Sequence, residues 1–388
     1  RRSNQERAPP MYKQRLFAPG PTPVPEETLL ELARPMFHHR TAEYRKMLEQ
    51  LTSDLQSILQ TAQPVYTITG SGSAAMEAAV VNVVAPGERI VAVRGGKFGE
   101  RWSDLGKAFG ADVIDLDIEW GAAVTADQIA ETLKANPDVV AVYIQHCETS
   151  TGTACDVEAI ARVVGKTDAL LVVDGITGVG ALPYYMDKWG VDITVVGSQK
   201  ALMLPAGLAF IACSEKAWKK IDATRAPVYY VDLKAYRKSL AKWDNPWTPA
   251  NVMVRAALKS TAMIRAEGLE KVWAETRRRA EATRAAAKAL GLKPFSKSPS
   301  DSVTAICVPE GVDGEALSKV MANDFGVRIA GGQAHLKGKI IRFSHMGYLD
   351  AFDCLAAVGA LEMALGKLGV AVAYGAGVAA AQKVLARE

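Results

Sequence analysis

The sequence of 388 residues contains only five cysteines, and none stands in a C-x-x-C pair. This spacing offers no disulfide framework or zinc motif, and separated free thiols are typical of the reducing cytosol. The nearest approach to a membrane segment, residues 368–381, is 14 residues long, whereas a helix needs about 20 to span a bilayer. Because the N-terminus also lacks an apolar signal core, we expect a cytoplasmic protein without membrane contact.

No strong excess of either charge marks the chain, which carries a net charge of +4 with 23% charged residues. The densest basic run, Arg277-Arg278-Arg279, has Glu275 and Glu281 close by, which is typical of a solvated helix face. Binding a nucleic-acid backbone needs many clustered positive charges, so we expect no nucleic-acid partner. Histidine, cysteine and carboxylate residues show no metal-site spacing, so we expect no metal.

What the sequence does have is an alternation of short apolar runs and helical stretches between residues 65 and 213. The run 170–173 is apolar throughout, as a strand buried on both faces should be. Such alternation predicts an α/β fold with a mostly parallel sheet sandwiched by helices. The predicted strands are 65–69, 89–93, 112–116, Val139–Gln145, 169–174, 192–197 and 208–213, and the helices between them are 73–84, 98–109, 125–134 and 156–164.

The flanking segments predict helices before this region and a mixed part after it. The predicted helices are 26–33, 42–60, 255–290 (which Gly268 could interrupt), Gly314–Phe325 and 349–368, and the strands are 302–308, 327–330 and Ile340–Ser344. We therefore predict a flexible N-terminal arm (1–16), a large domain (17–264) and a small C-terminal α+β domain (265–388).

Three polar segments stand where a predicted strand ends. Ser71-Gly72-Ser73 opens a helix, so it is either a phosphate cradle or an ordinary N-cap turn. Asp174 is either a ligand-binding carboxylate or an Asx turn. Lys200 lies among small and apolar residues and is either a desolvated nucleophile or an exposed loop lysine.

Together the three segments match the needs of pyridoxal 5′-phosphate. Its phosphate binds well at a helix N-terminus, its ring nitrogen pairs with a carboxylate, and its aldehyde reacts with an amine. A dinucleotide fingerprint would need a third glycine after Gly72, and a Walker A loop would need Gly-Lys-Ser/Thr. We therefore favour a large domain that binds pyridoxal phosphate.

Further motifs make the sequence resemble the class V, fold type I pyridoxal-phosphate aminotransferases of the alanine–glyoxylate, serine–glyoxylate and serine–pyruvate group. The motifs stand in family order between residues 17 and 347. They are Pro19-Gly20-Pro21-Thr22, Ser71-Gly72-Ser73, His146-Cys147-Glu148-Thr149-Ser150-Thr151-Gly152, Val173-Asp174, Gly197-Ser198-Gln199-Lys200-Ala201-Leu202, Thr248-Pro249-Ala250 and Lys337-Gly338-Lys339-Ile340-Ile341-Arg342-Phe343-Ser344-His345-Met346-Gly347.

This resemblance implies a role for each matching residue. Lys200 would bind the cofactor covalently and shuttle the substrate proton, and Asp174 would pair with the pyridine nitrogen. Arg342 would clamp the substrate carboxylate, a bidentate task that suits arginine. The other implied contacts are Ser71, Gly72, Ser73 and Gln199 at the phosphate, Phe98 stacked on the ring where other members have Trp, and Thr149 near ring O3′ and the substrate.

The resemblance also implies a homodimer in which a loop of the second subunit completes the phosphate site, with Asn245 and Thr248 as candidates. Ser73 stands where some members have His, so one phosphate contact can differ. The group His38, His39 and Arg40 either lines the substrate pocket or lies on the surface, and His146 is expected to be structural.

The implied reaction transfers the amino group of alanine or serine to glyoxylate or pyruvate by a ping-pong mechanism. Two alternatives stay open. A desulfurase-like lyase would need a nucleophilic cysteine shortly before Arg342, and residues 324–342 contain none. An aminotransferase-like subunit of a larger assembly would lack activity of its own, although this chain has every residue that the chemistry needs.

Overall fold

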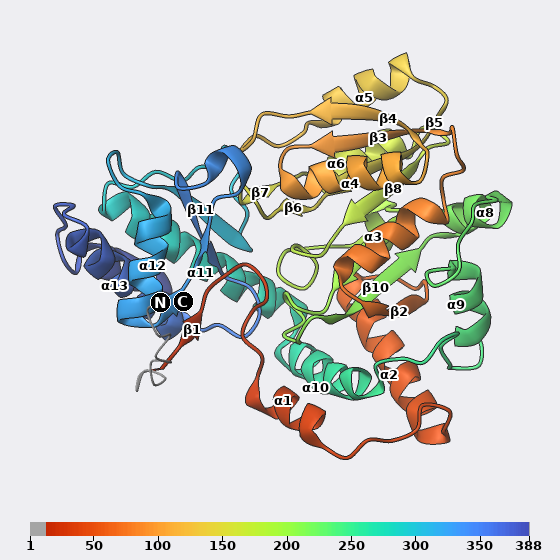
Figure 1. The fold of residues 1–388 in the computed structure, drawn as a ribbon, viewed down its shortest axis with the longest axis horizontal. Coiled ribbons are helices and arrows are strands. Elements are labelled where there is room, and N and C mark those ends of the chain that lie inside the picture. Colours follow the sequence, from red (N-terminus) through yellow and green to blue (C-terminus); the bar gives the residue numbers. More distant parts are fainter. Residues whose placement is uncertain (1–12, 388) are drawn as a thin grey trace, which may run out of the picture.

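A seven-stranded sheet forms the centre of the computed structural model, which describes residues 13–387 (Figure 1). The strands β9 (Ile193–Gly197), β8 (Leu170–Asp174), β5 (Val139–Gln145), β3 (Arg89–Arg94) and β4 (Asp112–Asp117) run parallel in this order. β10 (Gly207–Cys213) lies antiparallel between β9 and the edge strand β2 (Val65–Gly70), so β2 points the same way as β9. The predicted α/β fold with a mostly parallel sheet is therefore confirmed.

Both faces of this sheet are covered, because successive residues of a strand point to opposite sides. In β5, Val142 and Ile144 join one apolar cluster, whereas Ala141 and Tyr143 join the other. The first cluster is completed by α2 (Ala42–Leu59), α5 (Ala126–Ala135), α6 (Val157–Val164), α7 (Met186–Trp189) and α10 (Asn251–Glu267), and the second by α3 (Gly72–Val81), α4 (Lys97–Ala108), α8 (Glu215–Ala223) and α9 (Leu233–Leu240).

Parallel strands bring their carboxyl ends to one edge of a sheet, and in open α/β folds ligands bind outside this edge. Here Ser71 follows β2, Phe98 lies just beyond β3, Thr149 follows β5, Asp174 ends β8 and Lys200 follows β9. The segment after β5 forms a small hairpin of β6 (Cys147–Glu148) and β7 (Thr153–Ala154). The topology therefore gathers five of the predicted site residues at one edge.

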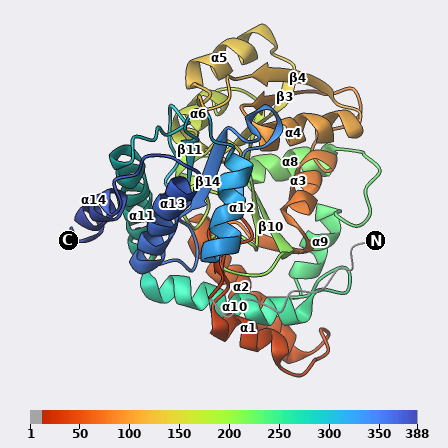
Figure 2. The same ribbon diagram turned by 60° about the vertical axis from the view of Figure 1, so that its left-hand side comes forward.

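Residues 269–387 form a C-terminal part beside the large sheet (Figure 1). A three-stranded antiparallel sheet has the order β11-β14-β13, and its helices α11, α13 and α14 pack side by side (Figure 2). The elements of this part are α11 (Leu269–Ala289), β11 (Val303–Cys307), α12 (Gly314–Phe325), β12 (Val327–Arg328), β13 (Ala330–Gly331), η1 (Ala334–Leu336), β14 (Ile340–Ser344), α13 (Ala351–Lys367) and α14 (Ala376–Leu385). Gly268 separates α10 from α11, and the predicted boundary after residue 264 falls inside α10 and stays a prediction.

The chain enters the fold on the C-terminal part and then crosses to the large sheet. Of the predicted arm, residues 1–12 lie outside the described part of the chain, and β1 (Arg15–Leu16) pairs in parallel with β12. The chain continues to α1 (Glu26–Ala33), which packs on α10. Between residues 13 and 387, no helix is both long and apolar enough to cross a membrane.

Helix α14 was not among the predicted elements, and a buried carboxylate holds its N-terminus. Glu362 of α13 is 3% exposed. Its carboxylate accepts hydrogen bonds from the backbone N–H groups of Gly375 (2.7 Å), Gly377 (2.7 Å) and Val378 (3.1 Å). Because these N–H groups lie at the positive end of a helix, the negative charge stabilises α14 against α13 and α11.

We expect Glu362→Ala to lower the free energy of unfolding by about 2–3 kcal/mol, since three buried N–H groups lose a charged acceptor. Chemical denaturation of the full chain measures this loss. Glu281→Ala, which removes an exposed glutamate from α11, is the control and should change stability by less than about 0.5 kcal/mol. Equal denaturation midpoints for Glu362→Ala and the unmodified chain would contradict the assignment.

Candidate active site

Lys200 lies in a buried loop that hydroxyl groups hold in place. Ser198 Oγ donates to the Pro205 carbonyl (2.7 Å) and accepts from the Leu208 N–H (3.2 Å), while Thr22 Oγ1 donates to the Lys200 carbonyl (2.8 Å). These bonds fix the backbone on both sides of Lys200. The lysine side chain is therefore set in position by the loop after β9, as the sequence predicted for a residue beyond a strand end.

The amine of Lys200 is desolvated, because only 7% of the residue is exposed. Burial lowers the pKa of Lys200 to about 8; nearby Cys147 and Asp174 raise this pKa, and Arg342 and Arg101 lower it. Roughly a tenth of the amine is then neutral at pH 7, far more than for an exposed lysine. A neutral amine is the form that attacks a carbonyl carbon.

A strap of residues 17–22 covers this amine. Lys200 Nζ donates to the carbonyl of Pro19, and the next residue, Gly20, has φ +125°. A Cβ at Gly20 would lie 2.5 Å from Lys200 Cε and Nζ, so only glycine allows the backbone this close. The strap is fixed at both ends, because Ser344 N donates to Phe17 O (2.8 Å) and Thr22 N donates to Gln199 O (3.1 Å).

Asp174 stands beside Lys200 at the end of β8, and 5% of it is exposed. Its Oδ1 accepts the Ile176 N–H at 2.9 Å. Burial raises the pKa of Asp174 to about 7; Glu148 raises it further, and Lys200 and Arg101 lower it. A buried carboxylate of this kind gains most from a ligand group that carries an N–H or a positive charge.

The N-terminus of α3 packs directly against the turn that follows Asp174. A Cβ at Gly72 would lie 2.6 Å from Ile176 Cδ1, so any larger residue would displace the Ile176 side chain. Ser71 is the N-cap residue of α3, yet its exposed side chain makes no capping hydrogen bond. The first N–H groups of α3 therefore remain available to an anion. Close by in sequence to Lys200, Gln199 Oε1 is buried without a hydrogen-bond partner among the described residues.

Three features of this sheet edge match the three reactive groups of pyridoxal 5′-phosphate. The uncapped α3 terminus suits the phosphate, the buried Asp174 carboxylate suits the ring nitrogen, and the neutral fraction of Lys200 suits the aldehyde. The buried Gln199 oxygen is a polar atom that a ligand or water could satisfy. The residues present therefore fit this cofactor. In the part of the chain between residues 13 and 387, no group of histidine, cysteine and carboxylate side chains could hold a metal ion.

Glu148 organises the first turn of α4, which carries Phe98. Its buried carboxylate accepts the N–H groups of Phe98 (3.1 Å), Gly99 (2.9 Å) and Ser150 (2.9 Å). Burial raises the pKa of Glu148, and these hydrogen bonds oppose the rise. The sequence motif that contains Glu148 did not indicate a function for this residue. In the structure, its hydrogen bonds to the first turn of α4 set where the half-exposed Phe98 ring lies.

Arg342 crosses from β14 of the C-terminal part to the large sheet. The residue is 6% exposed, its Nη1 donates to the Thr149 carbonyl (2.8 Å), and its Nε donates to the Gly331 carbonyl (2.9 Å). Burial lowers the pKa of Arg342 to about 10, so the guanidinium stays charged at neutral pH. Thr149 Oγ1 in turn shares a 2.6 Å hydrogen bond with Thr177, a residue that sequence reasoning missed.

The structure does not bring Asn245 to this set of residues. The Asn245 amide bonds within its own chain, accepting from the Tyr44 hydroxyl and donating to the Thr67 carbonyl (3.1 Å). Thr248, in contrast, is exposed.

The group at residues 38–40 lies on the loop between α1 and α2, where Arg40 pairs with Asp244 at 2.8 Å. The buried His146 packs on Tyr184 and Trp189, and burial lowers the pKa of His146 to about 4, which fits the structural function predicted for it.

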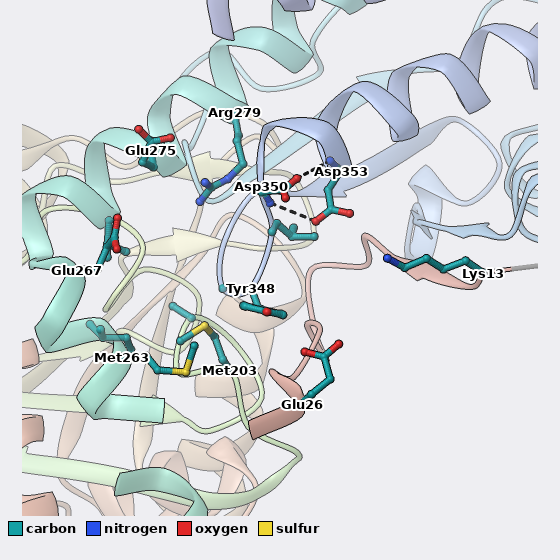
Figure 3. A pocket seen from close by; sticks show the side chains of 15 residues that line it. Lys13, Glu26, Met203, Met263, Glu267, Glu275, Arg279, Tyr348, Asp350 and Asp353 are labelled. Atoms are coloured by element: carbon teal, nitrogen blue, oxygen red, sulfur yellow. Dashed lines mark hydrogen bonds between the residues drawn. The ribbon is translucent and has the colours of Figure 1, made fainter. Parts of the chain in front are cut away.

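A separate cavity of about 460 Å³ opens between the large sheet and the C-terminal part (Figure 3). Glu267 and Glu275 come from α10 and α11, while Tyr348, Asp350 and Asp353 come from the loop and start of α13. Asp350 and Asp353 are engaged in the capping box of α13. None of the predicted site residues lines this cavity.

Comparison with known proteins agrees with this geometry. The family described as "Aminotransferase class-V" matches residues 17–351. The "Soluble hydrogenase 42 kDa subunit" of Anabaena cylindrica is 42% identical (95% of this chain, 98% of the relative), and the "L-aspartate--glyoxylate aminotransferase" of Paracoccus denitrificans is 36% identical (95% of each chain). The crystal structure of ureidoglycine-glyoxylate aminotransferase from Bacillus subtilis superposes with a TM-score of 0.92 at 28% identity, covering 98% of this chain and 99% of that one. The chain belongs to the class V aminotransferases.

Proposed function

We propose that this chain is a pyridoxal-phosphate transaminase that transfers the amino group of a small amino acid to glyoxylate or pyruvate. One observation carries the proposal: Lys200 is a buried amine whose pKa is lowered to about 8, and it stands beside the buried carboxylate of Asp174. Few purely structural roles call for such a pair at the ligand-binding edge of a parallel sheet. When bound, the cofactor supplies an aldehyde that takes up the amino group and a ring that accepts electrons from the substrate α-carbon.

The proposed residues divide the work of holding this cofactor. Ser71, Gly72 and Ser73 bind its phosphate at the α3 N-terminus, and Gln199 lies nearby. Asp174 would accept the ring N–H, and Thr149 would contact ring O3′. Phe98 would cover one face of the ring with its half-exposed side chain. Lys200 would supply the amine for the covalent bond and, as a free amine, would move the proton at the substrate α-carbon.

Arg342 is proposed to bind the carboxylate that amino acids and 2-oxo acids share. A guanidinium has five N–H groups, and Arg342 uses two on the carbonyls of Gly331 and Thr149, which leaves three for a ligand. Because one arginine serves both half-reactions, donor and acceptor occupy the same place in turn, as a ping-pong reaction requires. Glyoxylate as acceptor is supported by the names of the Paracoccus denitrificans relative and the Bacillus subtilis structure, whose donors differ from each other. The donor, alanine or serine, rests on the sequence resemblance.

We further propose a cytoplasmic homodimer in which the loop at Thr248 contacts the phosphate site of the second subunit. Thr248 offers an exposed hydroxyl for this contact. Asn245 is less suited, since Tyr44 and Thr67 already engage both ends of its amide.

The desulfurase alternative gains no support from the cysteines, which are all free. Cys307 lies on β11, and burial raises the pKa of its thiol. Cys354 lies buried in α13 beside Thr283, where burial also raises the thiol pKa. A protonated thiol within a strand or a helix is a poor nucleophile.

Replacing Lys200 by alanine should abolish transamination and the visible absorbance of the bound cofactor, because no other amine can form the covalent bond. Steady-state assays with alanine or serine and glyoxylate, together with absorbance spectra, measure both effects. Lys219→Ala, an exposed lysine of α8, should leave both unchanged. If Lys200→Ala retained turnover and absorbance, the assignment would be wrong. An unmodified chain that binds cofactor and transaminates no amino acid would favour the inactive-subunit alternative.

Arg342→Lys should lower kcat/KM for the amino donor by roughly 10- to 100-fold, since lysine keeps the charge but loses the bidentate geometry. Most of the change is expected in KM, because the carboxylate is bound in every state. Arg328→Lys, at an exposed position on β12, is the matched control. An unchanged KM for both donor and acceptor would remove Arg342 from the substrate site.

The rate at which cofactor-free protein captures pyridoxal 5′-phosphate should rise with pH through about 8. Burial lowers the pKa of Lys200 to about 8, so its neutral form grows about tenfold per pH unit below that value and levels off above it. Stopped-flow absorbance between pH 6 and 9.5 gives the midpoint, with Lys200→Ala as the blank. A midpoint near 10, as for an exposed lysine, would contradict a desolvated amine.

A further inference from the structure

Arg101 lies at the proposed phosphate site, although no sequence motif assigned it a function. It follows Phe98 by three positions on α4, so both side chains lie on the same face of the helix. Its Nη1 donates to Ser73 Oγ at 3.2 Å, and its guanidinium carbon lies 5.0 Å from the centroid of the Phe98 ring. Arg101 therefore joins two residues that the proposed function places on the cofactor.

The guanidinium of Arg101 is not engaged in an ion pair within the described part of the chain. Among the residues that the structure describes, no carboxylate forms an ion pair with its half-buried guanidinium. Ser73, to which Arg101 donates, lies in the first turn of α3, and the N-terminus of this helix carries a partial positive charge of its own. Two positive groups that face each other are stable when an anion binds between or beside them. The arrangement is thus incomplete without a negatively charged ligand.

The contact with Ser73 also prepares that hydroxyl as a donor. A serine hydroxyl has one proton and two lone pairs, and Arg101 occupies a lone pair of Ser73 Oγ. The proton of Ser73 is left for another acceptor, and its position in the first turn of α3 puts it beside the free N–H groups. The positive charge of Arg101 also acts electrostatically on Asp174 and Lys200, because it lowers the pKa values of both residues.

We propose that Arg101 is an additional anion-binding residue that, with Ser73 and the α3 N-terminus, binds the phosphate monoester of the cofactor. This inference rests on the proposed function. The guanidinium also covers the Phe98 ring on one side, which fixes the orientation of the ring that faces the cofactor. Binding of the substrate carboxylate is the competing assignment, but Arg342 serves that group at Thr149, whereas Arg101 contacts Ser73.

Comparing two ligands that differ only in the phosphate tests the proposal. The full chain freed of cofactor is titrated with pyridoxal 5′-phosphate and with pyridoxal, and the equilibrium affinities of Arg101→Gln are compared with those of the unmodified protein. We expect Arg101→Gln to weaken pyridoxal 5′-phosphate by about 10- to 100-fold, the value of a charged hydrogen bond, and pyridoxal by less than about threefold. Equal weakening of both ligands, or of neither, would overturn the proposal.

A matched control and a conservative variant complete the experiment. Lys97→Gln removes an exposed positive charge one residue before Phe98, where Lys97 pairs with Glu100, and should leave both affinities unchanged. Arg101→Lys keeps the charge and should recover part of the lost phosphate preference, and it serves as the primary variant if circular dichroism shows that Arg101→Gln is unfolded. No recovery in a folded Arg101→Lys would count against charge as the cause.

Two further outcomes separate this inference from the proposed function. If the unmodified chain binds no pyridoxal 5′-phosphate, the proposed function fails. If the chain binds the cofactor, but Arg101→Gln raises only the KM of the amino donor at saturating cofactor, Arg101 belongs to the substrate site and the phosphate assignment is wrong.

Discussion

The burial of one amine is the constraint on which the proposed chemistry depends. Lys200 can act as a nucleophile near neutral pH only because the sheet edge and the strap of residues 17–22 exclude water from it. The strap can come so close only because Gly20 has no side chain. One end of the strap, Phe17, is bonded to β14 of the C-terminal part, and the other end, Thr22, is bonded to the loop of Lys200. The strap therefore connects the C-terminal part with the large sheet. The low dielectric around Lys200 is therefore a property of the whole fold.

The same junction carries the proposed substrate site. Near Lys200, the large sheet and the C-terminal part share only a small apolar cluster. It consists of Ala181, Ala201, Val303 and Met346. Polar contacts accompany it, such as the bond from Arg342 to the Thr149 carbonyl. Hydrogen bonds between charged and carbonyl groups can be exchanged for bonds to a ligand at little net cost, whereas a large apolar contact cannot. A site on this junction can therefore bind and release two substrates in turn.

Sequence periodicity predicted most of the fold because both its strands and its helices bury apolar faces. The fully apolar run 170–173 became the all-buried β8, and the break at Gly268 occurs as expected. Helix α14 was missed because its Gly/Ala-rich segment has few large apolar residues to show a helical period. The helix is held by the carboxylate of Glu362, which is distant in sequence. Strand ends also indicated Lys200 and Asp174, since parallel topology alone brings them together.

Residues that act through tertiary contacts could not be predicted in this way. Glu148, Thr177 and Arg101 matter because of hydrogen bonds to Gly99, Thr149 and Ser73, which lie 28 or 49 positions away in the sequence. For Arg101 a weak local signal existed, namely its spacing of three from an aromatic residue on a helix.

The balance of buried charge shows what these residues do together. Glu148 offsets part of the charge of Arg342, but the hydrogen bonds of its carboxylate go to the backbone N–H groups of Phe98, Gly99 and Ser150. Asp174 is partly protonated near neutral pH, since burial raises its pKa to about 7. Arg342 stays charged, and no carboxylate among residues 13–387 forms an ion pair with Arg101, so positive charge exceeds negative charge around Lys200. A phosphate at one end and a carboxylate at the other would restore neutrality. The excess of positive charge around Lys200 would therefore favour an anionic cofactor together with an anionic substrate.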